Sequence, residues 1–270
     1  MTSVDRDRVV AALEEEWAAL LDLLGGLGPD DWGRPTACPG WSVQDNVAHV
    51  IGTEASLEGR PTPEVELGEV PHVRNELGRF NEQWVECYRS RPPAEVVADL
   101  RAVVEARRAS LAGMDQDAFD GPADTPGGPD TFGRFMRIRI MDTWMHEQDI
   151  REAVGTPGHL EGLAPAYTLE EVSAALGFVV GKRAGAPEGS TVRFELTGPL
   201  AARIDLAVTD RARLVERIDG EPTVTLTVPG DRFLRIVGGR TTTEDPAGSV
   251  KVTGDATLGG AVVRSLPYMI

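Results

Sequence analysis

Two histidines and one aspartate have the residue types and the spacing of a metal site. His49 lies in an apolar stretch, and Asp142 precedes His146 by four residues. Residues four apart on a helix lie on the same face, so this carboxylate and imidazole are neighbours. A carboxylate and a histidine from one helix, with a histidine from another, are the three ligands of an open, catalytic zinc site. A divalent metal centre is therefore one interpretation of this spacing.

The same residues also have an ordinary structural interpretation. A single Asp-x-x-x-His spacing is common, and His49 could be a hydrogen-bonded core histidine. Cys38 lies between turn residues, where it is either a reactive thiol or a small buried hydrophobe. His72 and His159 lie in loop-like segments, and we expect them to be solvated. The sequence contains no nucleophile elbow, Walker A loop or paired-cysteine zinc motif.

The candidate ligands are carried by helices of the N-terminal half. Apolar periodicity predicts helices over residues 4–24, 42–57, 73–88, 94–111 and 131–154. Ser42 and Asp45 have the capping-box spacing that begins the second of these helices, and Thr131 begins the last. The second helix carries the first histidine, and the last helix carries the other two candidate ligands.

The pattern changes after a Gly- and Pro-containing stretch at residues 155–164. Beyond it, the patterns predict a helix over 169–183, strands over 191–196, 202–208, 212–217, 223–228 and 249–253, and helices over 231–237 and 256–266. We predict an all-α domain over residues 1–158 and a smaller α+β domain with an antiparallel sheet over residues 165–270.

Composition narrows the possible partners. The chain has 27 basic and 43 acidic residues, and this net charge of −16 repels phosphate backbones, so no nucleic acid is expected. No apolar run approaches the ~20 residues that span a bilayer, and glutamates at 14–16 argue against a signal peptide. Two cysteines cannot form a disulfide framework. We expect a cytoplasmic monomer or homodimer that binds no membrane.

Two segments carry a specific pattern: Trp32 with Pro35-Thr-Ala-Cys-Pro-Gly-Trp-Ser-Val-Gln-Asp-Asn-Val-Ala-His49, and Arg139-Ile-Met-Asp-Thr-Trp-Met-His-Glu-Gln-Asp-Ile-Arg151. Together they resemble the signature of the mycothiol-dependent maleylpyruvate isomerases and their DinB-like relatives. The C-terminal half, with Gly239-Arg240 and Gly254-Asp-Ala256, is similar to the sterol-carrier-like domain that follows the bundle in many actinobacterial members. The resemblance covers nearly the whole chain.

This resemblance implies a DinB-like four-helix bundle that binds a divalent metal, usually Zn²⁺, through two histidines and a carboxylate. His49 and His146 match the two histidines. Asp142 stands where the isomerase has Glu, and because Asp is one methylene shorter, its backbone must lie closer to the metal.

The resemblance also implies a function. Mycothiol, the thiol cosubstrate, is held as a metal-bound thiolate that attacks an electrophilic small molecule. Reversal of the addition makes the protein an isomerase, whereas retention of the adduct makes it a thiol S-transferase. A rival from another class is a non-catalytic, metal-free module that binds a small apolar ligand in its C-terminal domain.

Two residues outside the ligand set have expected roles. Arg240 follows a Gly turn, and we expect its guanidinium to bind a carboxylate-bearing electrophile in a pocket between the two domains. Asp149 matches the family pattern and is expected to orient His146 or Arg139. The alternative for Asp149 is an ion pair with Arg151 or a neighbouring residue on the helix surface.

Overall fold

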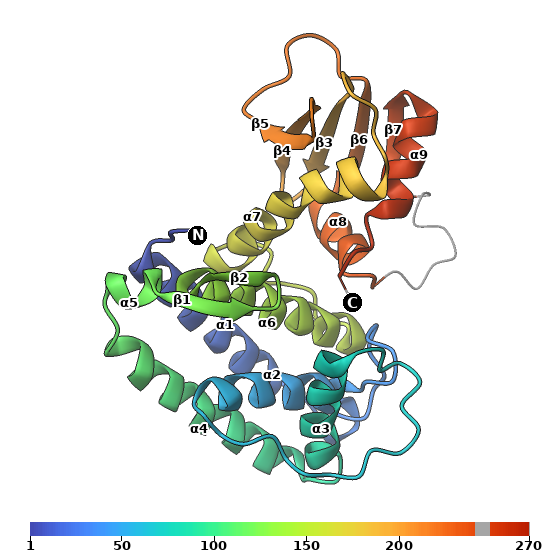
Figure 1. The fold of residues 1–270 in the computed structure, drawn as a ribbon. Helices are drawn as coiled ribbons and strands as arrows, with labels where there is room; N and C mark the ends of the chain where they lie inside the picture. Colours follow the sequence, from blue (N-terminus) through green and yellow to red (C-terminus); the bar gives the residue numbers. More distant parts are fainter. Residues whose placement is uncertain (241–248, 270) are drawn as a thin grey trace. The chain divides into compact units, whose positions relative to one another are not determined.

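A computed structural model describes residues 1–240 and 249–269 of the chain. The chain forms two compact units, Met1–His159 and Leu160–Ile270, which we call unit 1 and unit 2 (Figure 1).

Unit 1 is helical. It contains α1 (Arg6–Gly25), the 3-10 turn η1 (Pro29–Asp31), α2 (Val43–Leu57), α3 (Glu76–Arg89), α4 (Pro93–Ala112), α5 (Gln116–Asp120) and α6 (Phe132–Val154). α1 and α2 each pack against both α4 and α6, so these four helices close around one apolar core (Figure 1). The predicted four-helix bundle is confirmed. α3 lies outside this bundle, against α2.

The two helices that carry the candidate ligands begin at side-chain caps. The Ser42 side chain accepts a hydrogen bond from the Asp45 N–H, and Asp45 Oδ2 accepts one from the Ser42 N–H at 2.8 Å. The side chain of Thr131 accepts from the Arg134 N–H and begins α6. Both predicted caps are confirmed. A short hairpin of β1 (Pro122–Thr125) and β2 (Gly128–Thr131) leads into α6.

Unit 2 is α+β, as predicted. It contains α7 (Leu163–Phe178), the π-helical turn η2 (Val179–Arg183), β3 (Thr191–Thr197), β4 (Ala202–Val208), β5 (Ala212–Val215), β6 (Val224–Pro229), α8 (Gly230–Val237), β7 (Lys251–Gly254) and α9 (Ala256–Ser265). Within the described residues, one five-stranded sheet has the order β5-β4-β3-β6-β7.

One strand pair of this sheet differs from the prediction of an antiparallel sheet. β3 and β6 run parallel, whereas the pairs β3–β4, β4–β5 and β6–β7 are antiparallel. The chain reaches β6 only after β4 and β5, and it then enters the sheet on the other side of β3. Strand direction across such a crossover is not encoded in the alternation of side chains, which is the same in both directions.

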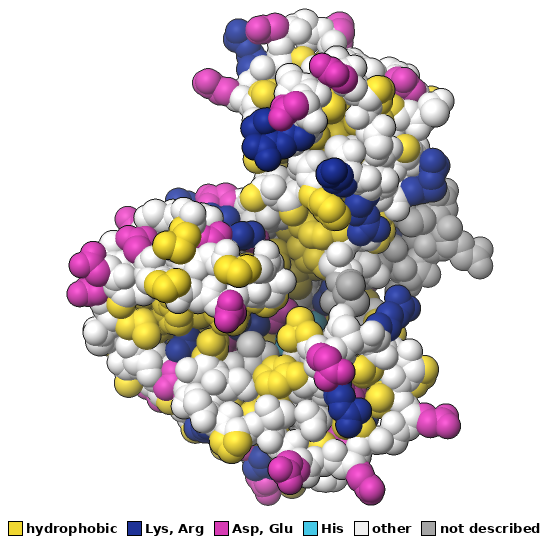
Figure 2. Space-filling model, viewed as in Figure 1, with side chains coloured by type: hydrophobic (Ala, Val, Ile, Leu, Met, Phe, Trp, Pro, Cys, Tyr) yellow, Lys and Arg dark blue, Asp and Glu magenta, His cyan; other side chains and the backbone are white. Residues whose placement is uncertain are grey.

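The helical segment Leu163–Arg183 is more apolar than expected, because we had found no apolar run that approaches the length of a bilayer span. It has 21 residues and a window of mean hydropathy 1.2, so by length and composition alone it meets the minimum for crossing a bilayer, alone among the described helices. Half of that window is buried inside the structure, as in the core helix of a globular domain. On the face drawn in Figure 2, acidic and basic side chains are interspersed over the surface.

The close approach of α2 and α3 gives a first prediction. A Cβ atom at Gly52 of α2 would lie 2.6 Å from Cβ of Trp84 on α3, which is buried. We expect Gly52→Ala to destabilise unit 1 by about 1–3 kcal/mol because the helices must separate. Urea unfolding followed by tryptophan fluorescence measures this, since all five tryptophans lie in unit 1.

The matched control is Gly25→Ala at the end of α1, where nothing lies within 4 Å of an added Cβ. This variant should be as stable as the parent or slightly more stable, because Ala favours helix over Gly. Equal stability of the two variants would show that α2 and α3 do not need the glycine.

Candidate metal centre

A tight turn before α2 places two side chains at the site. The Trp41 N–H donates to the Cys38 carbonyl at 3.1 Å, and Gly40 between them has φ of 80°, which glycine adopts without strain. The turn directs the Trp41 ring against both imidazoles, at centroid separations of 5.3 Å to His49 and 5.7 Å to His146. The aromatic ring therefore covers one side of the histidine pair.

The three predicted ligands lie together between α2 and α6. His49 Nε2 is 3.0 Å from Asp142 Oδ2, and His146 Nε2 is 3.8 Å from Asp142 Oδ1. Both histidines are buried, whereas the side chain of Asp142 is 31% exposed. The shorter Asp side chain thus reaches both imidazoles, and the group has one edge open to solvent.

This donor set fits a zinc ion. Two ligand atoms on a tetrahedral Zn²⁺ with bonds of about 2.1 Å lie about 3.4 Å apart. The two separations given above, 3.0 and 3.8 Å, bracket that value, and one donor atom from each residue can be chosen so that all three lie within 4.8 Å of one another. Two imidazoles and one carboxylate also match the ligands of open catalytic zinc sites.

Asn46 fixes which nitrogen of His146 is available. His146 Nδ1 lies 2.7 Å from Asn46 Oδ1, while Asn46 Nδ2 donates to Thr36 Oγ1 and to the Ser42 carbonyl. Because the amide nitrogen is committed to two acceptors, its oxygen faces His146, whose Nδ1 carries the proton. Nε2 is then the nitrogen that faces Asp142. This role of Asn46 was not predicted from the sequence, although Asn46 lies three residues before His49 on the same helical face.

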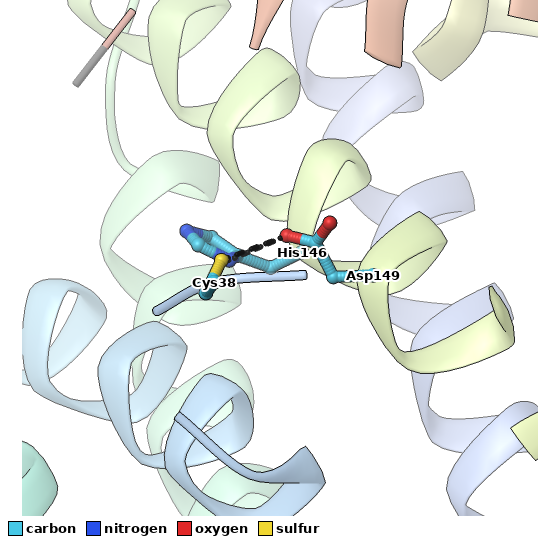
Figure 3. Close-up of side chains that lie close together, drawn as sticks. All are labelled: Cys38, His146 and Asp149. Carbon is cyan, nitrogen blue, oxygen red and sulfur yellow. Dashed lines mark hydrogen bonds and ion pairs between the residues drawn. The ribbon is translucent and has the colours of Figure 1, made fainter. Parts of the chain in front are cut away.

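Cys38 and Asp149 also lie near Nδ1 of the same imidazole (Figure 3). Cys38 Sγ donates to Asp149 Oδ2 at 3.1 Å, and that oxygen lies 3.4 Å from His146 Nδ1. Cys38, His146 and Asp149 are a second group of possible metal ligands. A metal between them would need His146 Nδ1, which already donates a hydrogen bond to Asn46 Oδ1. We therefore assign Asp149 to positioning His146. It is fully buried, so the alternative of a surface ion pair with Arg151 is wrong.

Burial and local charge act differently on the two histidines. Burial lowers the pKa of His49, and Asp142 offsets this only in part. Burial also disfavours the cation of His146, but hydrogen bonds with Asp149 and Cys38 outweigh it and raise its pKa to about 10. His49 is therefore neutral at pH 7, and its buried Nδ1 has no hydrogen-bond partner among the described residues. A metal at the site competes with a proton on His146.

Buried ion pairs connect Asp142 to charged side chains of α2 and α4. Arg139 Nη1 donates to Asp142 Oδ2, and Arg139 Nε donates to Glu54 Oε1 at 2.9 Å. The other Glu54 oxygen accepts from Arg107 Nε at 2.9 Å, and all three of these supporting side chains are buried. Burial raises the pKa of Asp142, but His49 and Arg139 outweigh it and hold that pKa well below its ordinary value. The carboxylate is therefore charged.

The other two histidines are not solvated, and that prediction was wrong. His72 Nε2 lies 2.9 Å from Glu82 Oε2, which also accepts from Trp41 Nε1 at 2.9 Å. His159 Nδ1 lies 2.6 Å from Glu147 Oε2, and its side chain is 10% exposed. Both segments fold back onto helices, which their loop-like composition does not reveal.

Arg240 lies in unit 2, directly after α8. Its Nη1 donates to the Gly238 carbonyl, and its backbone N–H donates to the Arg235 carbonyl at 2.9 Å. The residue is half-buried, and its role in binding an electrophile stays a prediction.

Domain families match both parts of the chain. The Mycothiol maleylpyruvate isomerase N-terminal domain matches residues 13–151, and the MDMPI C-terminal domain matches residues 167–261. The chain therefore belongs to the mycothiol maleylpyruvate isomerase family, which confirms the resemblance seen in the sequence.

Solved structures share the fold. A crystal structure of the mycothiol-dependent maleylpyruvate isomerase matches with a TM-score of 0.61 and 15% identity, over 94% of this chain and 96% of that one. A point mutant of that isomerase matches with a TM-score of 0.60 and 14% identity over the same shares. An uncharacterized protein of Mycobacterium tuberculosis (strain H37Rv) is 26% identical over 151 residues, or 54% of this chain and 56% of that protein. The match thus spans about half the length of that curated relative.

The buried ion pairs generate a second prediction. Arg139→Met should destabilise unit 1 by about 3–5 kcal/mol, because it leaves Glu54 and Asp142 without a shared cation in the helical core. Urea unfolding followed by tryptophan fluorescence is again the measurement. Arg101→Met on the exposed face of α4 is the control and should change stability by less than about 0.5 kcal/mol. A similar small change for Arg139→Met would contradict the role given to this residue.

Proposed function

We propose that this protein is a metal-dependent enzyme that uses mycothiol as its thiol cosubstrate. It acts on an electrophilic small molecule, as a maleylpyruvate isomerase-like enzyme or as a thiol S-transferase, and Zn²⁺ is the proposed metal. The observation that carries the proposal is the Asp142 carboxylate lying against both His49 and His146 at one partly open site. Both cysteines are free thiols, which suits the cytoplasmic location that we propose.

When bound, Zn²⁺ supplies a Lewis acid that lowers the pKa of a thiol, so that its sulfur reacts as a thiolate at neutral pH. The residues of the chain prepare the site for that chemistry. Asn46 directs His146 Nε2 toward the other ligands, and Arg139 keeps Asp142 ionised and oriented. Trp41 covers the imidazoles and excludes water from one side.

The ligand assignment is the third prediction. His49→Ala and His146→Ala should each lose one equivalent of zinc, because two remaining protein ligands form a weak site. Elemental analysis and chelator competition on untagged protein measure the loss. His72→Ala is the control and should bind as much zinc as the parent. Zinc affinity like that of the parent in either ligand variant would remove that residue from the site.

Metal content also separates the enzyme from its rival. Protein that is supplied with zinc and still holds well under one equivalent of any divalent metal would favour the metal-free binding module. Turnover of mycothiol with a maleyl electrophile, lost together with zinc in the histidine variants, would support the enzyme.

The fourth prediction concerns Arg240, which we propose binds the carboxylate of an acidic electrophile. A charged, planar guanidinium binds a carboxylate through two parallel hydrogen bonds. Arg240→Ala should therefore raise KM for carboxylate-bearing electrophiles about tenfold or more and leave KM for neutral ones unchanged. Arg217→Ala, at a side chain that is 74% exposed, is the control. An equal effect on acidic and neutral electrophiles would rule out this role.

A further inference from the structure

A third group of possible ligands lies in unit 1, between α1, α6 and the segment that follows α6. Glu16 lies in the middle of α1, Glu147 on α6, and His159 in the segment that follows α6. Both glutamates are fully buried and the histidine side chain is 10% exposed. One donor atom from each of the three residues lies within 4.8 Å of the other two.

Glu16 is the unusual member of this group. Neither of its carboxyl oxygens has a hydrogen-bond partner among the described residues, although both are buried. Glu16 Oε2 faces His159 Nδ1 at 3.7 Å, and the same nitrogen lies 2.6 Å from Glu147 Oε2. Burial of a carboxylate without hydrogen bonds costs several kcal/mol unless a cation or a proton neutralises it.

In Glu147 and His159, one polar atom of each side chain already contacts a residue outside the group. Arg151 Nε donates to Glu147 Oε1 at 2.8 Å, which leaves Oε2 facing the group. Glu15 Oε1 lies 3.4 Å from His159 Nε2, which leaves Nδ1 facing the group. A carboxylate on the far nitrogen of a histidine is the arrangement that orients metal-bound imidazoles.

The segment that carries His159 is fixed against α6. Trp144 Nε1 donates to the His159 carbonyl at 2.9 Å, and Gln148 Nε2 donates to the Gly158 carbonyl at 3.2 Å. His159 has φ of 53°, which is unusual for a residue other than glycine. The imidazole is therefore held over the two glutamates by its backbone as well as by its own contacts.

We propose that Glu16, Glu147 and His159 form a second, structural site for a divalent transition-metal ion such as Zn²⁺. Its two carboxylates and one imidazole are ligands that such ions accept, and all three side chains are buried or nearly so. The ion joins α1, α6 and the segment after α6. This site does not depend on the proposed enzymatic function, because it shares no ligand with His49, Asp142 and His146.

The test uses the full-length, untagged protein, stripped with a chelator and reloaded with Zn²⁺. We expect two equivalents of zinc in the parent, one in His49→Ala, one in Glu16→Gln and none when both changes are combined. Glu14→Gln is the matched control on α1, because that side chain pairs with Arg108 on α4 instead. It should retain both equivalents.

A second readout separates a lost ligand from a damaged fold. In the His49→Ala background, zinc should raise the thermal unfolding midpoint measured by tryptophan fluorescence, and Glu16→Gln should abolish that rise. If Glu16→Gln does not fold, His159→Gln takes its place. Zinc content that is unchanged by Glu16→Gln, or a His49→Ala variant that holds no zinc, overturns the proposal. Glu16 would then be a neutral acid that shares a proton with Glu147.

Discussion

The arrangement of unit 1 depends on the buried guanidinium of Arg139. It lies between Glu54 of α2 and Asp142 of its own helix, and Arg107 of α4 completes the set of charges. A buried charge without a partner costs several kcal/mol, so these ion pairs favour the register of α2, α4 and α6 in which the charged groups meet. That register also brings His49 of α2 opposite Asp142. The placement of the candidate ligands is therefore tied to ion pairs that connect Asp142 to residues outside the ligand set.

The long helix α6 shows how a bundle can hold polar chemistry inside an apolar core. Its face toward α2 carries Asp142, His146 and Asp149, and its face toward α1 carries Glu147. Helical periodicity alone separates these two sets, because residues one apart point about 100° away from each other. The buried side chains named here on α6 each have a hydrogen bond or an ion pair, which is the usual condition for polar groups in a core, whereas Glu16 of α1 has an ion pair with His159 but no hydrogen bond among the described residues.

Apolar packing between a sheet and helices is prominent in unit 2. Apolar side chains pack between the sheet and its helices, as between Phe194 of β3 and Phe233 of α8, whose ring centroids are 5.6 Å apart. Its buried Asp205 accepts from Arg193 and Arg203 on the sheet and from the Ile218 N–H. The crystal structure of the mycothiol-dependent maleylpyruvate isomerase shares the fold over 94% of this chain at 15% identity, so the two proteins have the same fold although most of their side chains differ.

The sequence by itself determined what depends on neighbours in the chain. The Ser42 cap and the four-residue spacing of Asp142 and His146 are local, and the structure has them where they were expected. The long helices of unit 1 also lie near their predicted ranges, whereas α7 begins at Leu163, before the predicted start at 169, and the short helix α5 was not predicted. Only the tertiary structure decided which distant groups meet. Asn46 lies 100 residues from the imidazole that it orients, and His159 reaches Glu16 across α6. Such contacts follow from the register of packed helices, which the pattern of apolar residues restricts but does not specify, because many registers bury the same apolar faces.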